Sequence, residues 1–134
     1  MPCDPGAFIQ SWRAAVESED MPDVFAHLAD TMTFHSPAVF KPATERPYIN
    51  KLLTFVGESI EDFAYAETYT QPGGAAMVFR GKIGGLVIEG IDLFKLDNDN
   101  KVTELKVMLR PLNAAVMLAQ SMRSKFEAAE GNRA

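Results

Sequence analysis

The sequence predicts an α+β fold, in which a strongly curved, mainly antiparallel sheet forms a cone around N-terminal helices and a C-terminal helix follows. Three observations predict it. Apolar residues recur at helical spacing through most of the first half of the chain. The second half reads as consecutive strands joined by short turns, which makes the sheet largely antiparallel. The helices cluster on one face of that sheet, as in other α+β folds.

Two helices are expected at the start of the chain. Apolar residues recur at helical spacing between Phe8 and Val16. Residues 18–20 break this pattern. Asp20 then begins a short second helix, because a short carboxylate can accept the free N–H groups of a first helical turn. The second helix keeps one apolar face as far as Leu28.

A short strand and a third helix follow. The strand Thr31–Phe34 is β-branched and aromatic, and Pro37 ends it or marks it as an edge strand. After a loop, Thr44 is the expected N-cap of the third helix, and Pro47 is tolerated in its first turn. The apolar stripe of this helix runs to Ile60.

The second half of the chain is expected to form four strands and a final helix. These elements are strands 63–69, 77–83, 86–96 and 102–109, and a helix from Pro111 to Phe126. The glycine pair Gly84-Gly85 signals a hairpin, and the polar run 97–100 is another turn. The run lacks the glutamate that ends a calcium loop, so it is not read as a metal site.

Length and composition limit the classes of function. The 134 residues fit one domain, expected over 7–127 with flexible ends at 1–6 and 128–134. A net charge of −5 argues against nucleic acid as a partner. One cysteine and two histidines make no disulfide scaffold, and no metal or cofactor is expected. The sequence has no apolar stretch of membrane-spanning length and no signal peptide at its start, so a cytoplasmic protein is expected.

The long strand 86–96 carries apolar residues on both of its faces. An antiparallel sheet covered on one side should have a polar second face. Here Ile88 and Phe94 share one face, and Ile91 and Leu93 share the other. The pattern predicts a homodimer through the second sheet face, since a two-fold copy would cover it. The alternative is that the helix 111–126 folds back over that face.

Two stretches of the sequence carry a resemblance to a known family. They are Trp12, Asp20-Met21-Pro22, Leu28-Ala29-Asp30 and Thr33-Phe34-His35-Ser36-Pro37, then Gly90-Ile91-Asp92-Leu93-Phe94-Lys95-Leu96-Asp97 and Lys101-Val102-Thr103-Glu104. Over residues 8–125 the chain resembles the nuclear transport factor 2-like (NTF2-like) superfamily, in its SnoaL-like polyketide cyclase and ketosteroid isomerase branch. The resemblance implies a cystatin-like cone with an apolar pocket for a small hydrophobic molecule. The same scaffold hosts enzymes and non-catalytic binders.

The isomerases of this branch use three polar groups in the pocket. A tyrosine on the first helix and a neutral aspartic acid on a late strand donate hydrogen bonds to the substrate oxyanion, and an aspartate before a proline moves the proton. The resemblance implies that these positions fall on Trp12, Asp92 and Ser36. Only the late-strand acid is retained. The resemblance therefore supports the pocket and argues against that isomerase reaction.

Asp92 is the main catalytic candidate, and it is expected to act as an acid or base. It shares a strand face with Ile88 and Phe94, and burial there should raise its pKa. The alternative is a structural carboxylate that is satisfied by a buried hydroxyl, an amide or the N–H of Trp12.

Ser36 and His35 are further catalytic candidates, and a set of apolar residues forms the expected pocket wall. Neighbours on a strand face opposite sides, so His35 could be a base only if the strand turns at Pro37. The expected wall residues are Trp12, Phe34, Phe40, Tyr48, Phe55, Tyr65, Phe79, Ile88 and Leu109. Each of them could equally belong to the core.

The sequence thus predicts a dimeric small-molecule-binding protein with an apolar pocket. Its catalytic form is an isomerase- or cyclase-type enzyme that uses Asp92 as an acid or base on an aromatic or polycyclic ketone. The alternative is a non-catalytic ligand-binding or protein-interaction module of the same fold.

Overall fold

The computed structural model describes residues 3–131, and its elements follow the predicted order of helices and strands. The elements of this part of the chain are α1 (Pro5–Glu17), α2 (Met21–Ala26), β1 (Leu28–His35), α3 (Arg46–Ser59), β2 (Glu61–Gln71), β3 (Gly74–Ile83), β4 (Leu86–Leu96), β5 (Val102–Arg110) and α4 (Leu112–Gly131).

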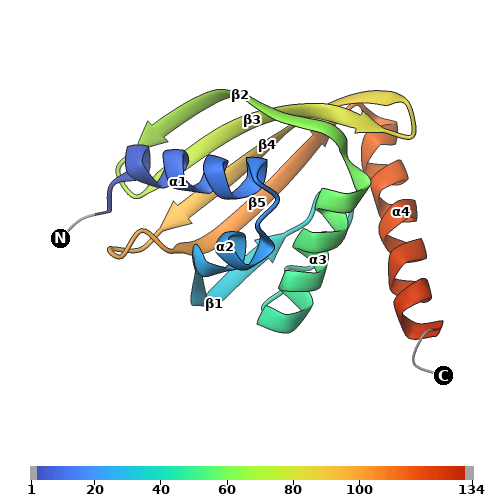
Figure 1. Cartoon of the computed structure of the whole chain (residues 1–134), viewed down its shortest axis with the longest axis horizontal. Helices are drawn as coiled ribbons and strands as arrows, with labels where there is room; N and C mark the ends of the chain where they lie inside the picture. The colour runs from blue at the N-terminus through green and yellow to red at the C-terminus, as the bar shows by residue number, and fades with distance from the viewer. Residues whose placement is uncertain (1–2, 132–134) are drawn as a thin grey trace.

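The strands form one curved sheet in the order β1-β5-β4-β3-β2. The pairs β2–β3, β3–β4 and β4–β5 are antiparallel, and β1 pairs with β5 in parallel. The helices α1, α2 and α3 lie on one face of this sheet, and α4 stands at its end beside α3 (Figure 1). The predicted α+β class, with a curved and mainly antiparallel sheet, is confirmed.

Short-range hydrogen bonds explain several of the element ends. The side chain of Asp4 accepts from the Ala7 amide at the start of α1, and that of Asp20 accepts from the Asp23 amide at the start of α2. The predicted Gly84-Gly85 hairpin is present, and both residues have positive φ, which costs a glycine little. The Asp20 cap and the hairpin were both predicted from sequence.

The start of α3 differs from the prediction. Glu45 is the N-cap, in place of Thr44, and it makes no side-chain cap hydrogen bond. The reason lies at Ala43, the residue before Thr44. Its N–H and C=O both pair with the backbone of Phe34, at 2.9 Å each. This bridge keeps the chain extended, so the helix begins later.

Ordered elements reach beyond the expected domain 7–127 on both sides. Helix α1 begins at Pro5, and α4 continues to Gly131. The strand expected at 31–34 is also longer, because β1 pairs with β5 from Leu28 onward. Of the expected flexible ends, residues 1–2 and 132–134 lie outside the described residues.

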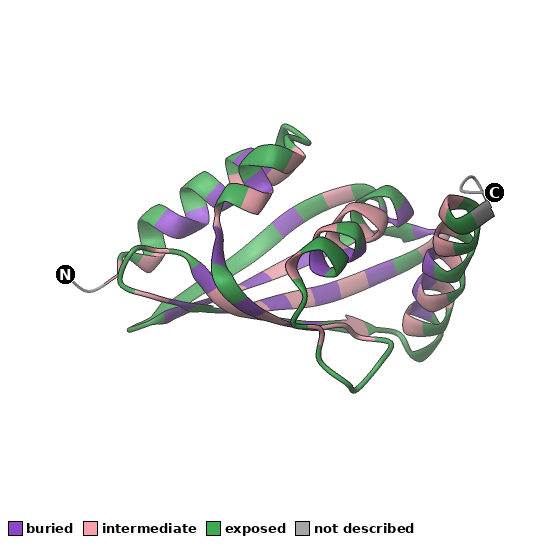
Figure 2. Ribbon diagram, turned by 90° about the horizontal axis from the view of Figure 1, so that it is seen from below, coloured by how far each residue is buried: buried purple, intermediate pink, exposed green. Residues whose placement is uncertain are grey.

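The core lies between the sheet and the helices, and burial alternates along the strands (Figure 2). Phe8 and Trp12 of α1 pack on Phe94 of β4, with ring centroids 4.9 and 5.1 Å apart. Each such aromatic side chain contributes about 2–3 kcal/mol by leaving water. The helix-covered face of the sheet is therefore aromatic and closely packed beside Asp92.

Helix α4 does not cover the second face of the sheet. Its buried residues Ala114, Leu118 and Met122 join the core beside α3. On the outer face, Val87 is 66% exposed and Met108 is 46% exposed. The alternative cover by the C-terminal helix is therefore wrong for this region, because the apolar stripe of α4 is already used against α3 and the sheet end.

Within residues 3–131, no helix combines the length and the hydrophobicity that a membrane crossing requires.

Candidate functional site

Three buried side chains form a hydrogen-bonded chain on the helix-covered face of the sheet. The indole N–H of Trp12 donates to the Tyr65 hydroxyl at 2.9 Å, and that hydroxyl donates to Oδ2 of Asp92 at 2.7 Å. The exposed fractions of the three residues are 3%, 8% and 7%. Because an indole can only donate, the chain has one direction and ends at the carboxylate. We call it the Trp12–Tyr65–Asp92 chain.

The sheet brings these residues together from elements that are far apart in sequence. Asp92 on β4 pairs with Met77 of β3 and Val107 of β5, both of which are buried. Tyr65 reaches it from β2, on the far side of β3. A carboxyl group among apolar neighbours needs such a partner, since an unpaired buried polar group is costly.

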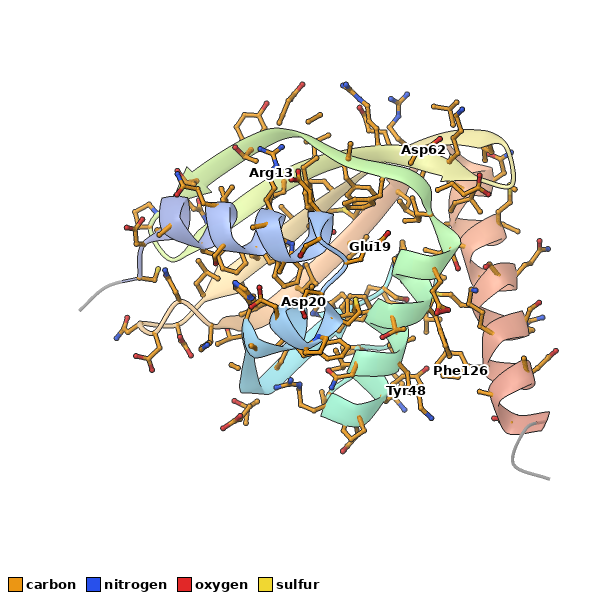
Figure 3. The ribbon with its side chains drawn as sticks, in the orientation of Figure 1. Arg13, Glu19, Asp20, Tyr48, Asp62 and Phe126 are labelled. Carbon is orange, nitrogen blue, oxygen red and sulfur yellow. The ribbon has the colours of Figure 1, made fainter. Side chains whose placement is uncertain are left out.

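Arg13 supports the tyrosine from α1. Its Nη2 donates to the backbone oxygen of Tyr65 at 2.9 Å, and its guanidinium carbon lies 6.0 Å from the centre of the Tyr65 ring. In Figure 3 the Arg13 side chain extends from α1 toward β2. Arg13 therefore ties α1 to the strand that positions the tyrosine hydroxyl.

Burial sets the protonation of the two ionisable groups in the chain. It raises the pKa of Asp92 from 3.8 to about 7, while the hydrogen bond from Tyr65 acts in the opposite direction. Burial, together with the nearby Asp92, raises the pKa of Tyr65 well above its ordinary value. Tyr65 therefore stays protonated near neutral pH, whereas Asp92 changes between its protonated and ionised forms in this pH range.

Further apolar side chains pack against the buried core. Side chains that pack against the core yet stay partly exposed include Val16, Met21, Phe25, Leu53, Val56, Phe63 and Leu109. Asp92 does not line either of the two hollows described next. Because Asp92 is 7% exposed, a ligand can reach it only if side chains that cover it move apart.

The two hollows lie on other surfaces. One holds about 320 Å³ on the outer face of the sheet, and it is lined by residues such as Tyr69, Leu93 and Glu104. The other holds about 300 Å³ between α3 and α4, where Tyr48 and Phe126 line it. Figure 3 shows these last two side chains close together at one end of both helices.

Some predicted wall residues lie away from Asp92. Phe40 is fully exposed in the loop after β1, and Tyr48 is 48% exposed. Phe55 packs edge-on against Phe126, with ring centroids 4.8 Å apart. The expectation that these three line a pocket with Asp92 needs correction. Helical spacing placed Tyr48 and Phe55 on α3, but it could not distinguish the stripe that faces the sheet from the one that faces α4.

Four of the other predicted wall residues belong to the core side of the sheet. Phe34, Phe79 and Ile88 are at most 2% exposed, and Leu109 is half-buried. Leu109 and Phe79 both lie over Gly90, where a side chain would collide with them. Packing explains all four positions.

His35 and Ser36 do not join Asp92. His35 faces the outer side of the sheet, where its Nε2 lies 3.4 Å from Oε1 of Glu104. The hydroxyl of Ser36 accepts from the Val39 amide at 3.2 Å and so holds a turn. His35 could act as a base at Asp92 only if the strand turned at Pro37, and instead its ring stays beside Glu104.

The hydrogen-bonding role of Tyr65 was missed from the sequence, which predicted it only as a wall or core residue. The signal available was its position on the inner side of the expected strand 63–69. A buried phenol needs a hydrogen-bond partner, as does a buried carboxyl. The sequence does not show that the two would satisfy each other.

Known structures share this fold. The chain aligns with a steroid delta-isomerase from Pseudomonas aeruginosa at 23% identity and a TM-score of 0.88, over 94% of this chain and 93% of the other. It aligns with an uncharacterized bacterial protein of cystatin-like fold from Silicibacter pomeroyi at 25% identity and a TM-score of 0.83, over 88% and 84%.

A third similar structure contains a small molecule. It is a protein with a ketosteroid isomerase-like fold from Catenulispora acidiphila in complex with trimethylamine, at 16% identity and a TM-score of 0.63, over 84% of this chain and 91% of that one. No protein-family model matches the sequence, and no curated protein is significantly similar to it. The predicted NTF2-like resemblance is thus confirmed at the level of the fold.

Proposed function

We propose that this chain binds a small apolar molecule against the helix-covered face of its sheet, with Asp92 as the polar group that contacts the ligand. The observation that carries the proposal is a carboxyl group that is 7% exposed among apolar side chains and has a pKa of about 7. Buried ionisable groups with shifted pKa values are concentrated at functional sites. The isomerase and the trimethylamine complex of the same fold support a small-molecule site.

The chemistry of Asp92 indicates the class of ligand. Below its pKa the acid can donate a hydrogen bond to a carbonyl oxygen, and above it the carboxylate can accept a proton. The surrounding aromatic and aliphatic side chains favour a hydrophobic body. An aromatic or polycyclic ketone combines both features.

Two observations limit which side chains can take part in catalysis at this site. The hydroxyl of Tyr65 donates to Asp92, so it has no second proton for a ligand oxygen. Ser36, at the position of the family's base, holds a turn. Asp92 alone therefore carries the acid/base function in an isomerase- or cyclase-type reaction. A binding module without turnover is the second candidate function, and the missing partner groups favour it.

Ligand binding is expected to show a preference for ketones that depends on Asp92. In the wild type at pH 6, an aromatic ketone should bind about tenfold more tightly than the matching hydrocarbon, because it gains one hydrogen bond. Asp92→Asn should keep this preference, since an amide still donates, and Asp92→Leu should abolish it. Fluorescence of Trp12, the chain's single tryptophan, reports binding beside Asp92.

Turnover separates the two candidate functions. If the protein is an enzyme, the ketone is converted, and Asp92→Asn stops conversion while binding remains. If it is a binding module, the ketone is recovered unchanged from the wild type. An Asp92→Leu variant that folds and still prefers the ketone would refute the role of Asp92, as would a panel of aromatic and steroidal ketones that fails to bind.

We further propose that the outer face of the sheet forms a homodimer. Apolar side chains on this face include Val78, Val87, Ile91, Leu93 and Met108. A two-fold axis places such a patch against its own copy. The cytoplasmic location and the absence of a nucleic-acid partner stay predictions from composition.

Ion pairs flank this apolar patch. Glu89 accepts from Arg80 at 3.0 Å and from Arg110 at 3.1 Å, and both contacts lower its pKa. Lys95 pairs with Glu104 at 3.1 Å toward the other end of the strands. Charged borders around an apolar centre are typical of interfaces between subunits.

The oligomeric state tests the dimer. Light scattering should give twice the chain mass of 14.7 kDa for the wild type. Met108→Lys should shift the protein toward the monomer, because it places a charge inside the interface. Gln10→Lys, an exposed position on α1, is the matched control and should stay dimeric. A wild type that is monomeric at every concentration contradicts the proposal.

A further inference from the structure

A second polar cluster joins α1 and α2, and its hydrogen bonds are separate from those of the Trp12–Tyr65–Asp92 chain. The hydroxyl oxygen of Ser11 lies 2.6 Å from Nε2 of His27. On the other side of the ring, Nδ1 of His27 lies 2.7 Å from the backbone oxygen of Asp23 and 3.9 Å from its Oδ1. Ser11 is exposed in the middle of α1, and His27 is the C-cap residue of α2.

The hydrogen bonds define which nitrogen of neutral His27 carries the proton. A backbone carbonyl can only accept, so Nδ1 donates to Asp23. Nε2 then presents its lone pair, and the Ser11 hydroxyl must be the donor in the 2.6 Å contact. The serine proton therefore points at a base.

Packing holds the imidazole in this orientation. Phe8 and Trp12 contact it edge-on, with ring centroids 6.1 and 5.8 Å away, and its side chain is 14% exposed. The Asp23 carboxylate lies where it can stabilise the ring once the ring gains a proton. The order of hydroxyl, imidazole and acidic residue is that of an activated serine nucleophile, which is recognised by geometry and not by sequence position.

We propose that Ser11 is a nucleophile, activated by His27, that accepts the acyl group of small activated esters at the surface of α1. The Ser11 oxygen forms a bond to the ester carbonyl carbon, and its proton moves to Nε2 of His27. The bond from that carbon to the leaving oxygen then breaks, and His27 returns the proton to the departing oxygen. The products are an acyl-serine and an alcohol or phenol.

The end of α2 that carries His27 is held by the segment that leads into β5. Nζ of Lys101 donates to the backbone oxygen of Ala26, the residue before His27. The amide of Val102, the first residue of β5, also donates to the His27 backbone oxygen, which ties β5 to the C-terminus of α2. The cluster thus combines a nucleophile, a base and an orienting group on a fixed helix end.

The test uses p-nitrophenyl acetate and locates the acetyl group by peptide mass spectrometry. Ser11 in the wild type should be acetylated about a hundredfold faster than the exposed serines Ser18 and Ser124, which is the lower range for general-base catalysis. His27→Gln should reduce the Ser11 rate to that of Ser124. Tyr69→Phe, an exposed substitution on β2 outside this cluster, is the control and should leave the ratio unchanged.

Two outcomes overturn the proposal. One is a wild type in which Ser11 is acetylated no faster than Ser18 or Ser124. These rates are compared within one protein, so this test does not depend on a variant that folds. The other is a folded His27→Gln protein, checked by circular dichroism, in which Ser11 reacts at the wild-type rate. Neither outcome bears on ligand binding at Asp92.

Discussion

The Asp92→Asn variant is expected to gain stability relative to the wild type as the pH rises from 4 to 8. Burial raises the pKa of Asp92 from 3.8 to about 7, so the folded chain holds a proton that the unfolded chain has already released. Protonated Asp92 makes its full contribution to the stability of the folded protein below pH 4. This contribution is lost as the pH rises through 7. At about 1.4 kcal/mol per pKa unit, the wild type loses about 4 kcal/mol.

Urea unfolding of both proteins at a series of pH values measures this effect. The difference between their free energies of unfolding isolates Asp92, because groups such as Glu89 and Glu104 titrate alike in both. Those two glutamates have lowered pKa values, so their own contribution is lost as the pH falls. A difference that stays constant between pH 4 and pH 8 would mean that Asp92 is not buried as described.

Tyr65→Phe provides an independent check on the same group. The Tyr65 hydroxyl lowers the pKa of Asp92, so its removal should move the titration of Asp92 above about 7. The Trp12 N–H and the carboxyl also lose their partner, which costs about 1–3 kcal/mol. Tyr69→Phe is the matched control, because its exposed hydroxyl donates to Glu67. It should leave the Asp92 titration unchanged.

Gly90→Ala is expected to destabilise the fold by about 1–3 kcal/mol, as overpacking of a core does. A Cβ at this position would lie 2.7 Å from Cδ2 of Leu109 and 2.7 Å from the backbone oxygen of Met108, and it would also collide with the Phe79 ring. The carbonyl belongs to β5, so it cannot retreat without disturbing the pairing with β4. The glycine is needed because Phe79 and Leu109 meet over it, close to Asp92 in the strand.

Gly57→Ala is the control for this substitution. It lies within α3, and a Cβ there would have no atom within 4 Å. Alanine in a helix is more favourable than glycine by about 0.5–1 kcal/mol, so this variant should be slightly more stable than the wild type. Thermal unfolding of both variants tests the pair. Equal melting temperatures for the two would show that the strand tolerates a side chain at Gly90.

Much of the local structure follows from the sequence because it depends on neighbours along the chain. Apolar spacing separated helices from strands, and the cap at Asp20 and the hairpin at Gly84-Gly85 follow from local hydrogen bonding and backbone freedom. The period of two placed Asp92 on the same strand face as Ile88 and Phe94. Its burial was therefore predictable from residues of a single strand.

The partner of that carboxyl was decided only by the tertiary structure. Tyr65 lies 27 positions away, on a strand that β3 separates from β4. Whether its hydroxyl reaches Asp92 depends on the registers of two strand pairs and on the shift within β2–β3. In the same way, the packing of α4 on α3 turned Tyr48 and Phe55 away from the sheet. Periodicity determines which face a side chain occupies, but contacts between separate elements depend on how those elements pack in space.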